Sequence, residues 1–459
     1  MVALRKPQPE LHAPARTLLP AMSKRLVDRL PLPTSRFVRL FAFALAPTLL
    51  AVIRPGLALV AVGLCVLLIV AFVVDALRLR GQKLLGARAV PELLHAFSEN
   101  ELELELENAG DARVSGTWLD VHPNGVDATG EFDLAPHERL VLALKLTPPR
   151  GLLAFGDLHL RLEGPWQLAS RHARIAASGN AKSYPDLREP GDELLLARAR
   201  QDGGLARLRR LGEGREFDAL RPYREGDDLR SVDWKASARR ASLVSREYVP
   251  EKNQALILLV DCGRLFVAQE RGRSRLDFAI EAALRLARTS LERGDAVGLI
   301  AFGASVRAFV PPAKGRMHLR ALTEAVFALQ PELEESDYGA AFDLLGKATT
   351  RRALVCTFTD LVDEDASRVL VARTAALRPK HLPLLVTLVD AELSRLQKEI
   401  PEGEEAAFAR AAANRLLRER SAAVARLRQV GATVISAPRD ALTSEAINAY
   451  LRIKARGLL

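Results

Sequence analysis

Continuous apolar runs alternate with amphipathic segments through the C-terminal half of the chain, and this alternation restricts the fold more than any other feature. The apolar runs occupy 255–261, 296–302, 353–360, 382–390 and 432–436. Runs of this length without polar alternation are typical of strands that are buried on both faces of a sheet. Such strands must be covered by other elements on either side, so a layered domain is expected here.

The segments between these runs have apolar residues at helical spacing. We predict helices over 275–293, 317–329, 338–347, 404–428 and 440–454. A further helix is predicted after the run at 353–360 and ends at about residue 377. The run at 306–312 predicts a short strand that can form an antiparallel edge. The alternation implies right-handed crossovers and a doubly wound, mostly parallel α/β sheet over 251–459. The stretch 391–405, rich in Glu and Lys, is expected to be a mobile loop.

Two long apolar runs, 37–53 and 57–74, lie near the start of the chain. As helices each would span roughly 26 Å, close to the thickness of a bilayer core. Basic residues flank the pair on both sides, which places both ends in the cytoplasm. We therefore predict a basic cytoplasmic leader over 1–36 and a transmembrane helical hairpin over 37–76.

Two alternatives were weighed for these runs. A buried hairpin of a soluble protein is disfavoured because the second run contains no charged residue. A cleaved signal peptide is disfavoured because the leader is long and two apolar runs follow each other.

Residues 90–182 predict a small β-sandwich. Residues 101–107 read ELELELE, and this alternation with period two is typical of a half-buried strand. Further short apolar segments follow, bounded by Gly, Pro, Asn or Asp, and 108–111 is expected to be a hairpin turn. No catalytic constellation is visible, and the histidines lack metal-ligand spacing: His122, His137, His159 and His172.

Composition excludes little. The net charge of +10 permits nucleic acid, anionic lipid or an acidic protein as partner, and the basic bias of cytoplasmic membrane-protein segments also accounts for it. Acidic residues interleave the arginines throughout, which argues against a uniform basic stripe for nucleic acid. The cysteines, 3 in all, form neither a disulfide framework nor a C-x-x-C pattern.

The segment 198–250 is densely charged, and its acids and bases alternate around Phe217, Tyr223 and Trp234. A disordered tail would lack the aromatic rings. We predict a compact segment that is held by ion pairs and anchored by buried rings.

This charged segment resembles the signature of a bacterial family called domain of unknown function number fifty-eight. The signature reads G-x-G-x-E-F, L-R-x-Y-x-x-G-D and R-x-I-D-W-K-x-x-A-R, with Val232 here in place of Ile. The matching residues are Gly212, Gly214, Glu216, Phe217, Leu220, Arg221, Tyr223, Gly226, Asp227, Arg230, Asp233, Trp234, Lys235, Ala238 and Arg239. The resemblance implies a protein of the bacterial inner membrane whose partner is a cytoplasmic AAA+ ATPase of the MoxR type.

The order of elements in 251–459 resembles a von Willebrand factor A domain. Functional members hold Mg²⁺ through a D-x-S-x-S motif, a Thr and a later Asp, because hard cations prefer oxygen ligands. Asp261 and Asp360 match the two aspartates, and Asp337 lies near the Thr position. Gly263 and Leu265 replace the two serines, so the resemblance implies a degenerate site that keeps at most weak Mg²⁺ binding.

These features favour a membrane-anchored adaptor without catalytic residues, whose von Willebrand-like domain faces a cytoplasmic partner. The alternative is a metal-dependent nuclease or phosphodiesterase that uses Glu216, Asp218, Asp233 and Lys235. No phosphate-binding loop of the G-x-x-x-x-G-K type supports the alternative. Nucleic-acid binding without catalysis is a third hypothesis. Whether the charged signature is structural or a docking surface stays open.

Overall fold

The computed structural model describes residues 31–50, 56–91, 93–121, 128–188, 216–224, 229–249, 254–349, 351–361 and 364–457. The chain divides into two compact units, Met1–Tyr184 and Pro185–Leu459. The described residues combine helices and strands in both units, in agreement with the predicted α/β class.

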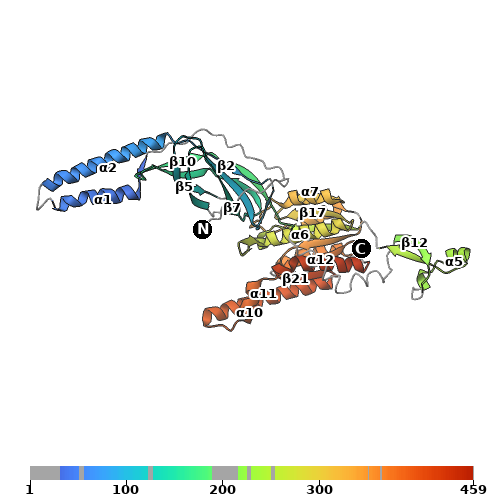
Figure 1. Ribbon diagram of the computed structural model, residues 1–459. Helices are drawn as coiled ribbons and strands as arrows, with labels where there is room; N and C mark the ends of the chain where they lie inside the picture. Colours follow the sequence, from blue (N-terminus) through green and yellow to red (C-terminus); the bar gives the residue numbers. More distant parts are fainter. Residues whose placement is uncertain are drawn as a thin grey trace. The chain divides into compact units, whose positions relative to one another are not determined.

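The first unit begins with two helices that lie side by side, α1 (Ser35–Leu50) and α2 (Gly56–Arg80) (Figure 1). The rings of Phe37, near the start of α1, and Phe72, near the end of α2, have centroids 5.0 Å apart. The helices are therefore antiparallel. Pro47 lies inside α1.

Among the described residues, one helix is long and apolar enough to cross a membrane, the part of α2 from Ala58 to Arg80. It has 23 residues, and only 11% of its apolar stretch is buried. A core helix of a soluble protein would bury most of such a surface. Many apolar side chains of α2 instead face outward, as at Leu59, Leu67 and Leu77.

The rest of the first unit is built from short strands. A five-stranded sheet has the order β1-β10-β9-β5-β6, and two three-stranded sheets have the orders β2-β4-β7 and β3-β11-β8. The strands are β1 (Leu32–Pro33), β2 (Leu84–Ala89), β3 (Leu94–His95), β4 (Asn100–Asn108), β5 (Val114–Asp120), β6 (Ala128–Leu134), β7 (Arg139–Leu146), β8 (Gly151–Phe155), β9 (Leu158–Glu163), β10 (Ala169–Ile175) and β11 (Gly179–Tyr184).

The alternation in β4 places its leucines in the core. Leu104 and Leu106 pack with Trp118 of β5 and Leu160 of β9, so one core joins the sheet of β4 to the five-stranded sheet. The intervening glutamates point away from this core, as period two requires. Ala76 and Leu79, in the last turns of α2, enter the same core.

Two details of the predicted β domain are wrong. The strand β2 precedes the predicted boundary at residue 90, and its Arg88 is buried, where it pairs with Asp120. A buried arginine interrupts the apolar pattern by which such a strand is recognised in the sequence. The predicted hairpin turn at 108–111 is also wrong, because β4 pairs with β2 and β7, whereas β5 pairs with β6 and β9.

The charged segment forms a small antiparallel pair, β12 (Glu216–Pro222) and β13 (Val244–Val249), with the short helices η1 (Leu229–Ser231) and α5 (Trp234–Arg240) between the strands. The hydroxyl of Ser237 donates to the carbonyl oxygen of Asp233 at 2.7 Å and accepts from the amide of Val244 at 2.9 Å. This buried serine thus ties α5 to the start of β13.

The second unit is organised around a six-stranded sheet with the order β18-β17-β14-β19-β20-β21. All neighbours are parallel except β17 and the edge strand β18. The strands are β14 (Ala255–Asp261), β17 (Ala296–Phe302), β18 (Val306–Ala313), β19 (Ala353–Phe358), β20 (Leu382–Leu388) and β21 (Thr433–Ala437). A two-stranded ribbon, β15 (Gln269–Glu270) and β16 (Arg273–Ser274), follows η2 (Arg264–Phe266).

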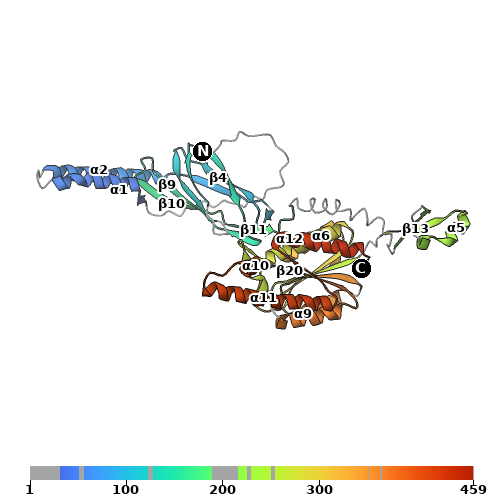
Figure 2. The ribbon, with the colours of Figure 1, turned by 90° about the horizontal axis from the view of Figure 1, so that it is seen from below.

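Helices cover both faces of this sheet. One core packs α6 (Arg275–Glu292), α7 (Arg316–Val326) and α12 (Arg439–Ala455) against one face. A second core packs α8 (Tyr338–Ala348), α9 (Glu364–Leu377) and α11 (Glu404–Gln429) against the other. Figure 2 shows α6 and α12 on one side of β20, and α9 and α11 on the other.

The predicted loop at 391–405 is wrong over its first half, because residues Ala391–Lys398 form α10. Asp390 caps this helix by accepting hydrogen bonds from the amides of Glu392 and Leu393 at 2.9 and 3.1 Å. Arg395 pairs with both Glu392 and Glu399 at helical spacing. A cap and charge pairs of this kind support a short helix most of whose residues are charged or polar.

Candidate functional site

The carboxyl ends of β14 and β19 hold two buried carboxylates, Asp261 and Asp360, which the sequence predicts as a degenerate metal site. The two strands are parallel neighbours, so their ends meet at one edge of the sheet. Asp261 is 1% exposed and Asp360 is 3% exposed. Buried carboxylates require partners, and the identity of those partners decides the chemistry of the site.

Asp261 has both carboxylate oxygens engaged by uncharged donors. One oxygen accepts from the amide of Gly263 at 2.9 Å and from the hydroxyl of Ser336. The other accepts from the hydroxyls of Thr359, at 2.7 Å, and Tyr338, at 3.0 Å. Burial raises the pKa of Asp261 and outweighs these hydrogen bonds, which lower it.

The hydroxyl of Ser336 occupies the space that a serine side chain would need at position 263. A Cβ atom on Gly263 would lie 2.0 Å from the Ser336 oxygen. Leu265, at the second serine position, is a partly buried side chain packed against the core. The loop before α8 therefore supplies a hydroxyl donor to Asp261, whereas neither serine position of the D-x-S-x-S motif supplies a side-chain hydroxyl.

Asp360 is paired with two arginines. Arg275, the first residue of α6, contacts one oxygen of Asp360 and also binds Asp390. Arg420 of α11 donates to the other oxygen at 2.9 Å, and Thr387 donates to that oxygen at the same distance. Two guanidinium groups thus lie against the carboxylate that a metal ion would need.

Asp337, the third predicted ligand, is the exposed N-cap residue of α8 and accepts from the amide of Ala340 at 3.0 Å. Among the described residues, no group of three or more His, Cys, Asp or Glu side chains is arranged to hold a metal ion. The donor set does not fit Mg²⁺, because guanidinium groups hold Asp360 and hydrogen-bond donors surround Asp261. The site is best described as a buried ion-pair and hydrogen-bond network.

Sequence reasoning missed Arg275, Arg420 and Thr359. Arg275 begins a helix, where an arginine is normally exposed, and Arg420 lies within a charged helix that gives no reason to single it out. Ser274 and Asp277 form a capping box that fixes the start of α6. That box was a usable signal for where Arg275 would be placed.

The charged signature is only partly within the described residues. Gly212, Gly214, Gly226 and Asp227 lie outside them, and so do the side chains of Glu216, Phe217 and Arg230. The members whose side chains are described are Leu220, Arg221, Tyr223, Asp233, Trp234, Lys235, Ala238 and Arg239.

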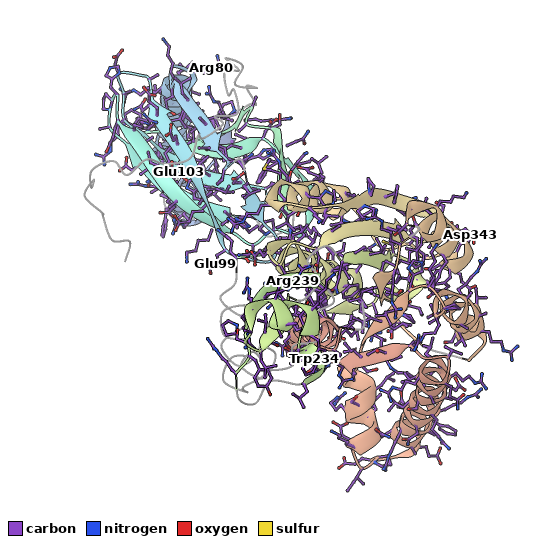
Figure 3. All side chains as sticks on the ribbon, turned by 90° about the vertical axis from the view of Figure 1, so that its right-hand side faces the viewer. Arg80, Glu99, Glu103, Trp234, Arg239 and Asp343 are labelled. Atoms are coloured by element: carbon purple, nitrogen blue, oxygen red, sulfur yellow. The ribbon has the colours of Figure 1, made fainter. Side chains whose placement is uncertain are left out.

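The prediction that the signature's rings are buried is wrong for Trp234, whose side chain is 66% exposed, while Tyr223 is half-buried. Trp234 is the first residue of α5, and Figure 3 shows it together with Arg239 on this helix. The helix is held by Ser237 on its inner side, so its first residue is free to face outward. Asp233 caps α5 by accepting from the amide of Ala236 at 2.9 Å.

Comparisons with known proteins add a family but no activity. Residues 219–427 match the model of the family described as "Protein of unknown function DUF58". Uncharacterized protein YeaD of Bacillus subtilis (strain 168) is 25% identical over 147 residues, which are 32% of this chain and 35% of that protein. The chain thus matches about a third of that relative's length.

A second relative and one solved structure are also similar to parts of this chain. Uncharacterized protein Rv1480 of Mycobacterium tuberculosis is 28% identical over 266 residues, which are 54% of this chain and 82% of that protein. The crystal structure of conserved hypothetical protein BatB from Bacteroides thetaiotaomicron aligns with 44% of this chain and 99% of its own, with 15% identity and a TM-score of 0.30. The chain carries a match to the family of unknown function DUF58 over residues 219–427, and the relatives described above are uncharacterised.

Proposed function

We propose that this protein is a membrane-anchored scaffold that presents its cytoplasmic domains to a protein partner. The observation that carries the proposal is Trp234, which stands 66% exposed on a helix held in place by a buried serine. A large ring left in water on an ordered element is typical of residues that become buried at an interface.

The neighbours of Trp234 support a docking surface. Leu229 is 64% exposed and Leu243 is 46% exposed, and Lys235 and Arg239 on α5 are exposed as well. We call these five residues the α5 patch. An apolar centre with basic residues around it suits a partner whose surface is acidic with an apolar pocket.

The anchor is α2, whose apolar side chains are exposed along its length. In this proposal α1 accompanies α2 into the bilayer as the first arm of a hairpin, so both ends of the chain lie in the cytoplasm. Val38, Phe43 and Leu45 are exposed on α1, which would cost free energy in water and cost nothing among lipid tails.

The network at the strand ends supports a binding role over a catalytic one. Asp261 and Asp360 are each saturated by donors of the chain itself, so neither is left to activate water. The nuclease alternative stays a prediction, although Asp233 already serves as a helix cap. Unchanged hydrolysis of nucleic acid by an Asp233→Asn, Lys235→Ala variant would remove it.

The partner we propose is a cytoplasmic AAA+ ATPase of the MoxR type, because the charged segment resembles the signature of a family that implies such a partner. The test is binding of the purified full-length chain, in detergent, to such an ATPase from the same organism. Trp234→Ala combined with Arg239→Glu should weaken binding by on the order of tenfold or more, because central aromatic and arginine contacts dominate interface energies.

A matched control is Met317→Ala combined with Arg320→Glu, an exposed pair of the same kind on α7. The control should bind like the wild type, and both variants should keep the wild-type melting temperature. Equal loss in the two variants, or a lower melting temperature in the Trp234 variant, would count against the α5 patch. No binding by the wild type would count against the ATPase as partner.

A further inference from the structure

The base of the helix pair is joined to the β domain by a buried carboxylate. Asp75, near the end of α2, is fully buried and accepts hydrogen bonds from three backbone amides, those of Trp166, Leu168 and Ala169, at 3.0, 2.9 and 3.0 Å. A Cβ atom on Gly164 would lie 2.3 Å from the Asp75 carboxylate. Only glycine at position 164 lets the turn approach α2 this closely. The turn at 164–169 is therefore fixed to the end of α2.

The start of α1 is fixed to the same turn. The amide of Thr34 donates to the carbonyl oxygen of Leu168 at 3.0 Å, and its hydroxyl contacts the carbonyl oxygens of Gln167 and Leu168. The strand β1 also pairs with the start of β10, which follows the turn. Both helix ends and the turn thus form one rigid junction.

Exposed basic and aromatic groups surround this junction. The guanidinium carbon of Arg78 lies 4.9 Å from the centroid of the Trp166 ring, and Trp166 is 41% exposed. Arg36 donates to the side-chain oxygen of Gln167 at 3.2 Å. Arg39 and Arg80 are exposed on the same ends of α1 and α2, and Arg80 is labelled in Figure 3. We call these four arginines and Trp166 the junction collar.

The arginines of the collar have no acidic partner in an ion pair among the residues that the structure describes, although most exposed arginines elsewhere in the first unit do. An arginine stacked on an indole and another held by an amide are oriented without forming an ion pair. Guanidinium groups bind phosphate through paired hydrogen bonds. The collar therefore presents ordered guanidinium groups, unpaired within the described residues, around the buried Asp75, whose oxygens are occupied by backbone amides.

The position of the collar relative to the apolar helices identifies what it would meet. Tryptophan and arginine side chains concentrate where a membrane-spanning helix leaves the hydrocarbon, at the level of the lipid phosphates. Basic residues there attract anionic lipids on the cytoplasmic leaflet. The exposed apolar surfaces of α1 and α2 end at the collar.

We infer that the junction collar is a binding site for the phosphate headgroup of an anionic phospholipid. Arg36 and Arg78, which flank the Trp166–Gln167 turn, would contact the phosphate, and the Trp166 ring would lie at the headgroup level. This inference rests on the proposed membrane anchor and adds to it a preference among lipids. A bare apolar helix would show no such preference.

The test is lipid binding to the full-length chain in micelles, followed by native mass spectrometry during titration with phosphatidylglycerol or phosphatidylcholine. Phosphatidylglycerol should bind more tightly, and Arg36→Gln combined with Arg78→Gln should weaken it on the order of tenfold. The control, Arg113→Gln combined with Lys145→Gln, removes the same charge from exposed ion pairs outside the collar and should bind like the wild type.

Equal binding of the two lipids, or equal effects of the two double variants, would overturn the inference. Displacement of phosphatidylglycerol by excess inorganic phosphate would also overturn it, since the site would then recognise a free anion. Extraction of cell membranes with alkaline carbonate tests the anchor separately. A wild-type chain that stays in the membrane without lipid preference refutes the collar alone, and one that is extracted refutes the anchor and the collar together.

Discussion

Arg275 contacts Asp360, one of the carboxylates that the sequence analysis expects to be metal ligands. Its guanidinium joins Asp360, at the end of β19, to Asp390, the cap of α10. The residue is 7% exposed, and such a buried charge is tolerated only when its partners are well placed. The cation of this site is therefore built into the chain.

Replacing Arg275 with methionine should lower the free energy of unfolding by up to about 3–5 kcal/mol, because it removes one of the two guanidinium groups that hold the buried Asp360 carboxylate. The double variant Arg275→Met, Asp360→Asn should recover part of this loss, since the uncompensated charge is removed. Denaturant unfolding of the full-length chain in detergent measures both. If the single and double variants are equally unstable, packing of the arginine stem, and not its charge, holds the site.

The resemblance to the von Willebrand factor A motif singles out Asp261 and Asp360 as a pair, and the structure places them after neighbouring parallel strands. The resemblance does not identify their partners. Arg420 comes from a helix far away in the sequence, and nothing in its local pattern distinguishes it from exposed arginines. The capping box locates Arg275 at the start of α6 but does not identify Asp360 as its partner. The sequence analysis also predicted Trp234 to be buried, because an aromatic residue is expected in a core unless a binding partner is considered.

At the scale of elements, the closing helix α12 is attached to the sheet by a buried polar contact. The hydroxyl of Tyr450 donates to Asp295 at 2.5 Å, and the ammonium group of Lys454 donates to the same carboxylate at 2.6 Å. Asp295 directly precedes β17, so this contact fixes α12 beside the start of that strand. Burial and the neighbouring Asp295 carboxylate raise the pKa of Tyr450.

Tyr450→Phe should lower the free energy of unfolding by about 1–3 kcal/mol, because a hydrogen bond to a buried carboxylate is lost while the ring still fills its place. Thermal unfolding of the full-length chain checks this. Arg452→Gln, at an exposed position of the same helix, serves as control and should change the melting temperature little. An unchanged melting temperature for Tyr450→Phe would show that Lys454 alone satisfies Asp295.

Elements with continuous apolar runs were predicted nearly to the residue, as β14 and β17 show. Elements that depend on charge were not. Most residues of the short helix α10 are charged or polar, and a buried arginine interrupts the apolar pattern of β2, so neither element was predicted. The crossing of β4 to a different sheet from β5 is a tertiary choice that local turn residues do not encode.

At the scale of the whole molecule, the proposed anchor predicts where a charge is tolerated. Leu67→Arg, near the centre of α2, should disfavour insertion by about 2.5–3.5 kcal/mol, the cost of arginine at the middle of a membrane helix. Leu77→Arg, equally apolar and near Arg78 and Arg80, should be tolerated because the new charge lies at the interface. Resistance to alkaline carbonate extraction measures both, and equal behaviour of the two variants would contradict the anchor.

The clamp between Asp75 and the turn at 164–169 leaves α2 and the β domain no hinge at their junction. A helix longer than the local hydrocarbon thickness responds by tilting. With a rigid joint, that tilt becomes an equal rotation of the β domain against the membrane plane. The angle between the β domain and the lipid surface would thereby depend on the thickness of the bilayer.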